Sequence, residues 1–450
     1  MSKAEKSGIK GLTEFFKGKS VALLGVGISN ASLISFLSSL GVTLSLRDKR
    51  TPDPSLYEGT DAKLYFGEGY LDGLDEDIIL KTPVIRPDVP ELIKAERGGS
   101  LVTGEIELFL RFCPCKTFAV TGSDGKTTTA AVTAELLKTT GKTVFLGGNI
   151  GYPLLCRLHE IKEDDFAVVE LSSFQLINCH YSPDTAIITN VTQNHLDWHT
   201  DMNEYSAAKC NIFKNEDASH LVLNADDPIT ASFKDGFSKK TSTFSVLSKD
   251  ADAYLLGEKL YFKGERILDR SDIKLVGLHN VKNYLAAFLA TAHHIKGEGL
   301  LKTARSFNGV AHRIEFIREK DGVKYYNSSI DTTPARTKAA LGAFSDKLIV
   351  IAGGYDKKLS YEPLVETFDE HAKALILFGA NTPKIKEVLK NKRSNYEIIE
   401  AESFEKTVLI AQGIAKNGDT VILSPASASF DHFKNFEQRG DLFKKLVNSL

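Results

Sequence analysis

The sequence predicts an α/β protein made of three consecutive blocks, each containing a mostly parallel sheet. Short apolar runs alternate with helix-like segments along all 450 residues, which is typical of strands joined by crossover helices. This length fits two to four domains, and the 42% of apolar residues can fill several cores. A proline break in "RFCPCK" ends the first block, so we expect domains at residues 1–112, 113–311 and 312–450.

Composition narrows the class of protein. The 56 Lys and Arg residues nearly balance the 58 Asp and Glu residues, which argues against binding to nucleic acid or to an anionic membrane. The first twenty residues lack a signal-peptide core, and no apolar run is long enough to span a membrane. Five cysteines, an odd number, indicate reduced thiols, so we expect a cytoplasmic location.

The first block opens with a predicted βαβ unit. Strands are expected at 21–24 and 42–46, with a turn at 25–27 and a helix at 32–39. The turn resembles the dinucleotide fingerprint G-x-G-x-x-G, but Asn30 occupies the position of the third glycine. The unit therefore predicts a Rossmann-like domain whose dinucleotide fingerprint is only two-thirds present.

The second block contains a candidate phosphate-binding loop, "TGSDGKTTT", between a strand at 117–120 and a helix. In such a loop glycines let backbone N–H groups face a phosphate, Lys126 can reach outer phosphates, and Thr127 can bind Mg²⁺. Val120 stands where the usual P-loop pattern has its first glycine. A glycine turn followed by a basic helix start is the alternative.

Two further polar residues follow predicted strands of this block. Glu170 comes after the strand 166–169 and could bind a metal ion, or cap the next helix. His195 comes after the strand 186–189, at the sheet edge where open α/β sheets bind ligands, although lone histidines are more often structural. His199 is expected to be a surface residue.

Three other residues are ambiguous from the pattern alone. Lys209, in "YSAAKCNIF", has the pattern of an ordinary solvated helix lysine. Asn280 and Asn283 lie three residues apart on one helical face, so they could bind a base or ribose, or cap the helix. Strands of the third block are expected at 348–352, 374–378 and 420–423, which favours a second Rossmann-like domain.

The motifs together resemble those of the Mur ligases, the ATP-dependent amide ligases of peptidoglycan precursor synthesis. The segments occur in order along essentially the whole chain: "TGSDGKTTT", "GGNIG", "VVELSSFQL", "NVTQNHLDWH", "AAK", "LNADDP", "GLHNVKN" and "AHRIE". "ELSSFQL" and "LSPASASFDHFKNFEQRGDLF" are similar to the family members that add D-glutamate to UDP-N-acetylmuramoyl-L-alanine. A "DNPR"-like segment, expected of the diaminopimelate- or lysine-adding members, is missing.

The resemblance implies a fold with a central ATP-binding domain between two Rossmann-like domains. It also explains the loop, because the family pattern G-[TS]-x-G-K-[ST] lacks the leading glycine and Gly122 makes the turn. The implied ATP-binding residues are Gly122, Ser123, Asp124, Gly125, Lys126, Thr127, Thr128, Asn280, Asn283 and Arg313. The implied catalytic residues are Lys126, Glu170, His195 and Lys209.

The resemblance further implies two Mg²⁺ ions. Thr127 and Glu170 would hold one with the ATP phosphates, and His195 would lie near the other with Lys209, which is carbamylated in this family. UDP-substrate contacts are expected from Ile28, Ser29, Asp48, Lys49, Arg50 and Asn149. Glutamate contacts are expected from Thr332, Lys357, Ser429, Phe430 and Phe436.

The implied reaction joins D-glutamate to the substrate carboxylate through an acyl phosphate and consumes ATP. We expect the protein to be a monomer. Three alternatives remain: a dinucleotide-dependent dehydrogenase, another P-loop enzyme such as a kinase, or a catalytically silent relative. The partial fingerprint weakens the first alternative, and the glutamate-type C-terminus weakens the second.

Three positions depart from the family pattern. In "YYNSSIDTTPART", Ser328 stands where we expect aspartate and Ile330 where we expect lysine, and Arg336 could restore the lost cation. Val84, in "KTPVIRPD", stands where the family has a glycine that allows close backbone approach. Ser328 and Ile330 motivate the alternative of a silent relative, while Val84 bears on the contacts to UDP.

Overall fold

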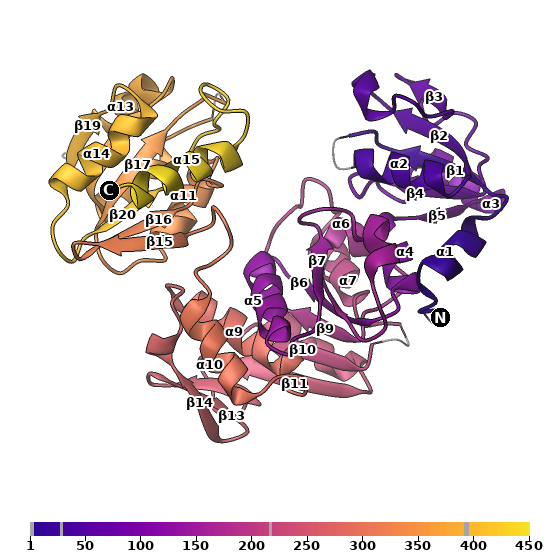
Figure 1. Cartoon of the computed structure of the whole chain (residues 1–450), viewed down its shortest axis with the longest axis horizontal. Coiled ribbons are helices and arrows are strands. Elements are labelled where there is room, and N and C mark those ends of the chain that lie inside the picture. Colours follow the sequence, from indigo (N-terminus) through magenta and orange to yellow (C-terminus); the bar gives the residue numbers. More distant parts are fainter. Residues whose placement is uncertain (1–3, 28–29, 216–217, 358, 391–395) are drawn as a thin grey trace. The chain divides into compact units, whose positions relative to one another are not determined.

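The computed structural model describes residues 4–27, 30–215, 218–357, 359–390 and 396–450, and it contains three separate sheets (Figure 1). This arrangement confirms the predicted α/β class. The chain divides into two compact units: the first comprises the chain up to Asp272 together with Leu278–Arg305, and the second comprises Ile273–Gly277 with Ser306–Leu450. Within the part of the chain that the structure describes, no helix is long and apolar enough to cross a membrane.

The first sheet has five parallel strands in the order β3-β2-β1-β4-β5. The strands are β1 (Ser20–Leu24), β2 (Thr43–Asp48), β3 (Lys63–Phe66), β4 (Ile78–Lys81) and β5 (Leu101–Thr103). The predicted βαβ unit is therefore present. The helices of this region are α1 (Gly8–Phe16), α2 (Ala31–Ser39), η2 (Pro54–Leu56), α3 (Pro90–Arg97) and α4 (Glu105–Phe112).

The second sheet has nine strands in the order β14-β13-β12-β11-β10-β9-β6-β8-β7, and only β12, β13 and β14 pair antiparallel. Its strands are β6 (Lys116–Thr121), β7 (Val144–Gly148), β8 (Phe166–Glu170), β9 (Thr185–Ile188), β10 (His220–Asn224), β11 (Lys240–Ser245), β12 (Ala253–Leu256), β13 (Lys259–Phe262) and β14 (Glu265–Asp269). All strands predicted for this block are found, with ends that differ by one residue or none.

The helices of the second sheet follow the parallel strands. They are α5 (Lys126–Lys138), η3 (Leu154–Glu160), α6 (Ser173–Leu176), α7 (Met202–Cys210), α8 (Pro228–Ser232), η4 (Phe233–Gly236), η5 (Arg270–Asp272), α9 (Leu278–Thr291) and α10 (Gly297–Ser306). The α5 and α9 helices pack against one another, and both are largely buried.

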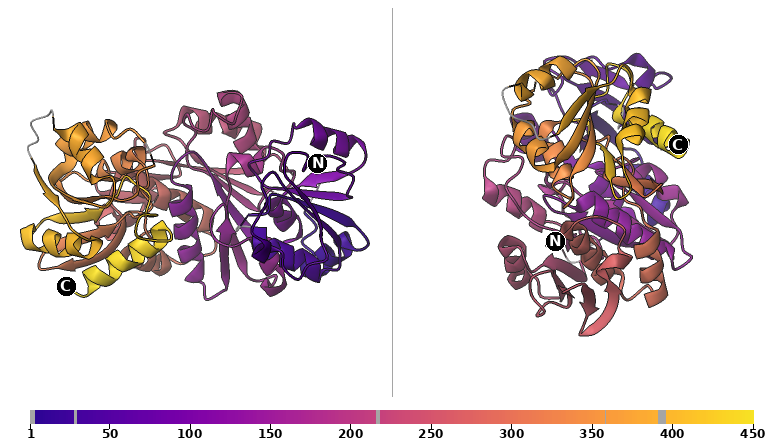
Figure 2. Two further views of the ribbon diagram at one scale, coloured as in Figure 1. Left: turned by 90° about the horizontal axis from the view of Figure 1, so that it is seen from above. Right: turned by 90° about the vertical axis from the view of Figure 1, so that its left-hand side faces the viewer.

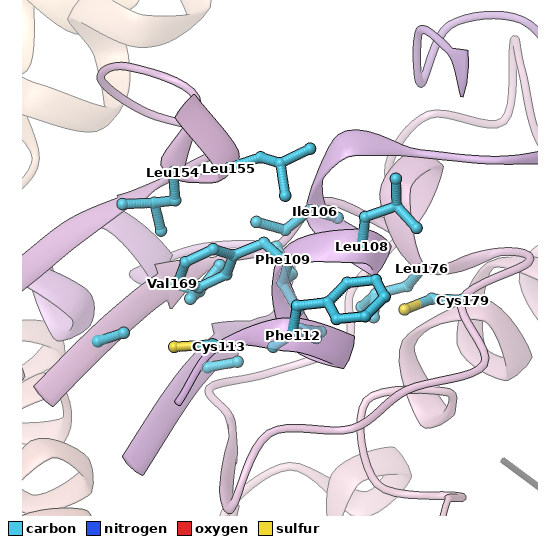
Figure 3. Close-up of a cluster of buried hydrophobic side chains, with 14 of the residues drawn as sticks. Ile106, Leu108, Phe109, Phe112, Cys113, Leu154, Leu155, Val169, Leu176 and Cys179 are labelled. Atoms are coloured by element: carbon cyan, nitrogen blue, oxygen red, sulfur yellow. The ribbon is translucent and has the colours of Figure 1, made fainter. Parts of the chain in front are cut away.

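One apolar core joins the first two sheets (Figure 3). Helix α4 lies in its centre, and its side chains meet those of η3, β8 and α6. The labelled members are Ile106, Leu108, Phe109, Phe112, Cys113, Leu154, Leu155, Val169, Leu176 and Cys179. Because burying each large apolar side chain contributes roughly 1.5–3 kcal/mol, this core accounts for both sheets lying in one compact unit.

The second unit, coloured orange to yellow in Figure 2, holds a six-stranded sheet. The strand order is β15-β16-β20-β17-β18-β19, and the strands are parallel except for β15. Its strands are β15 (Glu315–Lys320), β16 (Val323–Asn327), β17 (Leu348–Gly353), β18 (Ala372–Phe378), β19 (Glu397–Glu400) and β20 (Thr420–Leu423). Helices α11 (Pro334–Leu341), α12 (Pro363–His371), α13 (Thr382–Leu389), α14 (Phe404–Ile414) and α15 (Phe436–Asn448) bury apolar faces against two separate cores.

Candidate functional site

The sequence-predicted residues of the second sheet meet at one edge. Strands β6, β8 and β9 are parallel, so their carboxyl ends lie side by side. The glycine-rich loop follows β6, Glu170 is the last residue of β8, and the loop with His195 follows β9. This is the edge at which open α/β sheets bind ligands.

The phosphate loop requires its two glycines. Gly122 has φ 147°, and a Cβ there would lie 1.9 Å from the hydroxyl of Thr189. Gly125 has φ 76°, and a Cβ there would lie 2.5 Å from Oδ1 of Asn283. Both conformations disfavour side chains, and both neighbours occupy the space. The loop is therefore a complete turn without a glycine at position 120.

Hydrogen bonds hold the loop in shape. The hydroxyl of Ser123 lies 2.9 Å from both the carbonyl of Thr192 and the hydroxyl of Tyr205. The backbone N–H of Asp124 donates to Oδ1 of Asn190 at 2.9 Å. The side chain of Asp124 is exposed, which avoids placing an acid inside an anion-binding loop. The loop is thus built before any phosphate arrives.

Two lysines converge on one carbonyl of this loop. The ammonium of Lys126 lies 3.0 Å from the Gly122 oxygen, and that of Lys209 lies 2.9 Å from the same oxygen. Lys209 is 1% exposed, and no carboxylate of the described residues lies within ion-pair distance of it. Burial, followed by the charge of Lys126, lowers the pKa of Lys209 to about 7. The prediction that Lys209 is an ordinary solvated helix lysine is therefore wrong.

Glu170 is an incompletely satisfied buried acid. It is 2% exposed, and its Oε1 accepts a hydrogen bond of 3.0 Å from the amide of Asn149. Its Oε2 is buried without a hydrogen-bond partner among the described residues. Buried polar atoms are rarely left unpaired, so this oxygen fits a ligand of a hard cation. Thr127, at the start of α5, is also buried.

The metal-binding residues expected at this edge do not form a site by themselves. No group of three or more His, Cys, Asp or Glu side chains suited to a metal gathers anywhere in the described ranges. Glu170 and His195 are the only such members of the expected set. A cation here would need oxygen from Thr127, from bound phosphates, or from a modified Lys209.

The two histidines after β9 have opposite environments. His195 is exposed and has φ 55°, an unusual conformation for a residue with a side chain. Partial burial and then the charge of Lys126 lower its pKa from the usual value, which favours the neutral ligand form. His199 is 2% exposed, so the expectation of a surface residue is wrong. Its ring packs against Phe174 and Trp198.

Asn280 and Asn283 lie on one face of α9, as expected, and both are buried. The amide of Asn283 donates to Oδ1 of Asn280 at 3.1 Å, and the Thr129 hydroxyl lies 3.1 Å from Oδ1 of Asn283. Asn283 also faces Gly125, so this pair supports the back of the phosphate loop. Arg313 lies in the second unit.

The residues expected to bind UDP are only partly described, because Ile28 and Ser29 lie outside the described residues. Asp48 ends β2, and its carboxylate accepts the backbone N–H groups of Val26 at 2.7 Å and Arg50 at 2.8 Å. Asp48 thereby shapes the first turn, while Lys49 and Arg50 are exposed.

A cavity of about 250 Å³ lies within the first unit. Its walls come from the loops after β1 and β4, from α4, from the loop after β7 and from α6, and they include Asn30, Thr82, Asn149 and Gln175. The expected substrate residue Asn149 therefore reaches both this cavity and Glu170. Val84, at the departure from the family pattern, is 64% exposed and does not fill it.

In the second unit, the expected glutamate residues lie after the carboxyl ends of three adjacent parallel strands, β16, β20 and β17. Thr332 follows β16, Ser429 and Phe430 follow β20, and Lys357 follows β17. A bridge between Tyr355 and Ala428 joins two of these loops, and the ring of Tyr355 lies 6.1 Å from that of Phe430. Phe436 begins α15 and packs against His312.

Arg439 holds these loops together. It lies within the segment "LSPASASFDHFKNFEQRGDLF", but no role was predicted for it. It is 0% exposed, and its guanidinium donates to the carbonyls of Ser427, Ala428 and Ser329 at 2.8–3.1 Å. Burial lowers its pKa to about 10. Its acceptors among the described residues are these carbonyls and the hydroxyl of Ser329, so we infer that Arg439 fixes the geometry of the loops.

We expect Arg439→Met to destabilise the protein by about 3 kcal/mol, because three buried carbonyls would lose their donor. Urea unfolding measures the change. Arg318→Met is the matched control, since Arg318 donates to one exposed carbonyl, and its effect should stay within about 0.5 kcal/mol. Equal losses in both variants would contradict the assigned role of Arg439.

The segment 327–336, which departs from the family pattern at Ser328 and Ile330, carries charged side chains at neighbouring positions. Ser328 and Asp331 are both buried, and the carboxylate of Asp331 lies 2.8 Å from the Ser424 hydroxyl. Burial raises the pKa of Asp331 to about 6. Arg336 folds back, and its guanidinium donates to the carbonyl of Ile330 at 3.1 Å. A cation therefore lies beside the position where lysine was expected.

Comparison with known proteins places the chain in a family. The description "Mur ligase middle domain" matches residues 120–291, and "Mur ligase, glutamate ligase domain" matches residues 312–427. The chain belongs to the Mur ligase family. Curated proteins similar to this Mur ligase include the UDP-N-acetylmuramoylalanine–D-glutamate ligase of Clostridium botulinum strain 657, 45% identical over 457 residues, with 99% of this chain and 100% of that protein covered. The Clostridium perfringens strain 13 protein of the same name is 45% identical and covers 97% of this chain and 98% of its own length.

Solved structures show the same fold. The UDP-N-acetylmuramate–alanine ligase of Thermotoga maritima has a TM-score of 0.59 at 20% identity, covering 96% of this chain and 99% of its own. A UDP-N-acetylmuramoyl-L-alanyl-D-glutamate–2,6-diaminopimelate ligase has a TM-score of 0.59 at 18% identity, covering 83% and 86%. These similarities support the Mur ligase fold. They do not indicate which substrate the protein uses.

Proposed function

We propose that this Mur ligase adds D-glutamate to UDP-N-acetylmuramoyl-L-alanine, with cleavage of ATP to ADP and phosphate, in peptidoglycan precursor synthesis. The near full-length identity of 45% to curated D-glutamate ligases carries the proposal. The preformed phosphate loop supports ATP use. We further propose that the protein works as a cytoplasmic monomer on small-molecule substrates.

In the proposed reaction, a carboxylate oxygen of the alanyl group attacks the γ-phosphorus of ATP and ADP leaves. The D-glutamate amine then attacks the acyl carbon, loses a proton, and releases phosphate. Backbone N–H groups of residues 122–127 would hold the phosphates, and Lys126 would neutralise charge on the transferred group. The carboxylate and ATP are both anions, so cations must offset their repulsion.

Two Mg²⁺ ions suit the residues at this edge and would supply that positive charge. Glu170 and Thr127 fit one, since Glu170 has a buried oxygen without a hydrogen-bond partner among the described residues. His195 and carbamylated Lys209 fit the other. The shared carbonyl of Gly122 supports the modification, because two ammonium groups held to one oxygen repel each other and a carbamate removes that repulsion.

We assign the substrates to domains by the same reasoning. Residues 1–112 would hold the UDP group with Ile28, Ser29, Asp48, Lys49 and Arg50, while Asn149 would contact the sugar end near Glu170. Residues 113–311 would bind ATP, aided by Arg313. Residues 312–450 would hold glutamate with Thr332, Lys357, Ser429, Phe430 and Phe436.

A phosphate-release assay tests the proposed function. Release should require ATP, Mg²⁺, UDP-N-acetylmuramoyl-L-alanine and D-glutamate together, and mass spectrometry should find the joined product. L-Glutamate in place of D-glutamate tests the stereochemistry. Release without an amino acid would indicate an ATPase, and no release with all four components would indicate a silent relative. Either result would sink the proposal.

Arg336 offers a sharper test of the altered segment. We expect Arg336→Ala to lower kcat about tenfold, since it removes the cation beside Ile330, while the melting temperature stays unchanged. Lys338→Ala, on the same helix α11, is the control and should retain full rate. Full activity of Arg336→Ala, with unchanged affinities for ATP and glutamate, would exclude this role.

A further inference from the structure

A side chain of the first sheet reaches into the second. Arg86 lies in the segment after β4, and all five of its N–H donors are engaged. Two bonds of 2.8 and 2.9 Å go to Asp88, two of 2.8 and 3.1 Å go to Glu204 on α7, and one of 2.7 Å goes to the carbonyl of Trp198. A lysine could not reproduce this planar arrangement.

Trp198 strengthens the same contact. Its indole N–H donates to the carbonyl of Val84 at 2.9 Å, and the guanidinium carbon of Arg86 lies 4.9 Å from the centre of its ring. The loop after β9 is therefore tied twice to the segment after β4. Trp198 is also the only tryptophan in the chain, so its fluorescence reports directly on this contact.

Glu204 continues the network inward. It accepts a hydrogen bond of 3.0 Å from Nδ1 of His199, whose Nε2 lies 2.9 Å from the hydroxyl of Ser173. Since the carboxylate only accepts, Nδ1 carries the proton, and Ser173 donates to Nε2. Because Ser173 is 2% exposed, we assign this hydrogen-bonded series of serine, histidine and acid a positioning role.

The network surrounds the strained residue His195. The carbonyl of His195 accepts hydrogen bonds from the backbone N–H groups of Trp198 at 3.1 Å and His199 at 2.9 Å. One tight turn therefore joins His195 to the two residues that contact Arg86 and Glu204. Its φ of 55° costs about 1–3 kcal/mol and persists only where neighbours enforce it. The anchoring helix α7 also carries Lys209.

We propose that Arg86 and Glu204 are positioning residues that hold the loop 195–199 so that His195 faces the ATP and Mg²⁺ site. The inference rests on the proposed function of that site. The segment 82–88, which lies beside the substrate cavity through Thr82, thereby sets the geometry of a residue on a different sheet. His199 transmits the constraint to α6, which begins three residues after Glu170.

Arg86→Lys and Glu204→Gln test whether Arg86 and Glu204 hold the loop 195–199, an arrangement that we call the clamp, in the full-length protein. Calorimetry with a non-hydrolysable ATP analogue should show Mg²⁺ affinity about tenfold weaker in both variants. Acrylamide should quench Trp198 more strongly in both, without any ligand. The double variant should resemble either single variant, because the two residues act as one unit. In the assay, saturating Mg²⁺ should restore most of kcat.

Arg157→Lys is the matched control. Arg157 also makes a double contact with one carboxylate, that of Glu160, and stacks 4.8 Å over Phe145, so it controls for loss of a comparable surface pair. It should leave Mg²⁺ affinity and quenching unchanged. Unchanged Mg²⁺ affinity in folded Arg86→Lys and Glu204→Gln would overturn the clamp, even if their melting temperatures fell.

The two proposals can fail separately. If the unmodified protein releases no phosphate with all four components, the proposed ligase function fails. The calorimetric and quenching comparisons still decide whether Arg86 and Glu204 hold the loop. If the unmodified protein is active but its variants bind Mg²⁺ normally, only the clamp fails.

Discussion

Replacing Lys209 by alanine is expected to lower kcat of the ligase at least about 1,000-fold, the size of effect seen when a preorganised charge is removed from a reacting centre. The side chain is 1% exposed, and its ammonium donates a hydrogen bond to the carbonyl of Gly122. Its loss would therefore remove a group from beneath the phosphate loop and leave the outer surface unchanged.

The expected chemistry depends on a neutral amine. Burial and the charge of Lys126 lower the pKa of Lys209 to about 7, so near neutral pH a large share of the amine is unprotonated. The neutral nitrogen can attack the carbon of CO₂ and release a proton, which gives a carbamate. A carbamate presents oxygen to a hard cation as a carboxylate does.

Two measurements separate modification from simple packing. Protein prepared with isotope-labelled bicarbonate should show a carbamate signal by NMR, and Lys209→Ala should lose it. A short carboxylic acid added to Lys209→Ala should restore part of the rate, because it can supply the missing oxygen ligand. Lys214→Ala, at an exposed lysine nearby, should behave like the unmodified protein. Full activity of Lys209→Ala would refute the role.

Local patterns predicted the strands and the edge of the site because both depend on short stretches. An apolar run followed by a polar residue marks a strand end, so Glu170 and the phosphate loop were found where they lie. The glycines at 122 and 125 could be interpreted because their close neighbours are set by the turn itself. The role of Lys209 came only from the family resemblance.

Residues whose partners are distant in sequence were missed. Arg86 and Glu204 are 118 residues apart, and nothing in "KTPVIRPD" indicates which carboxylate its arginine will meet. His199 was misjudged because it is buried against Phe174 and hydrogen-bonded to Ser173, both from an earlier element that packs on this loop only after folding. Arg439 was missed because its acceptors are backbone carbonyls, which leave no mark on the sequence.

Replacing Glu170 by glutamine is expected to separate stability from activity. Glutamine keeps the size of the side chain and can still accept the hydrogen bond from Asn149. It removes a buried charge of which one oxygen has no hydrogen-bond partner in the described structure. Because an uncompensated buried charge is costly, the melting temperature without ligands should stay the same or rise.

The activity of Glu170→Gln should fall although its melting temperature does not. A neutral amide is a poor ligand for Mg²⁺, so kcat should fall about 1,000-fold, and added Mg²⁺ should no longer raise the melting temperature in the presence of an ATP analogue.

Glu76→Gln is the matched control for Glu170→Gln, since Glu76 is a buried carboxylate whose partners, Arg47 and Ser45, lie within the protein. It should lower the melting temperature and spare kcat, because breaking a satisfied buried pair leaves Arg47 without its counter-charge. The two substitutions make the same chemical change at similarly buried sites. Opposite effects on melting temperature and on kcat would therefore show that Glu170 serves to bind a ligand and Glu76 serves to stabilise the fold. A loss of stability in Glu170→Gln equal to that in Glu76→Gln would mean that Glu170 is satisfied by the protein, and the metal assignment would fall.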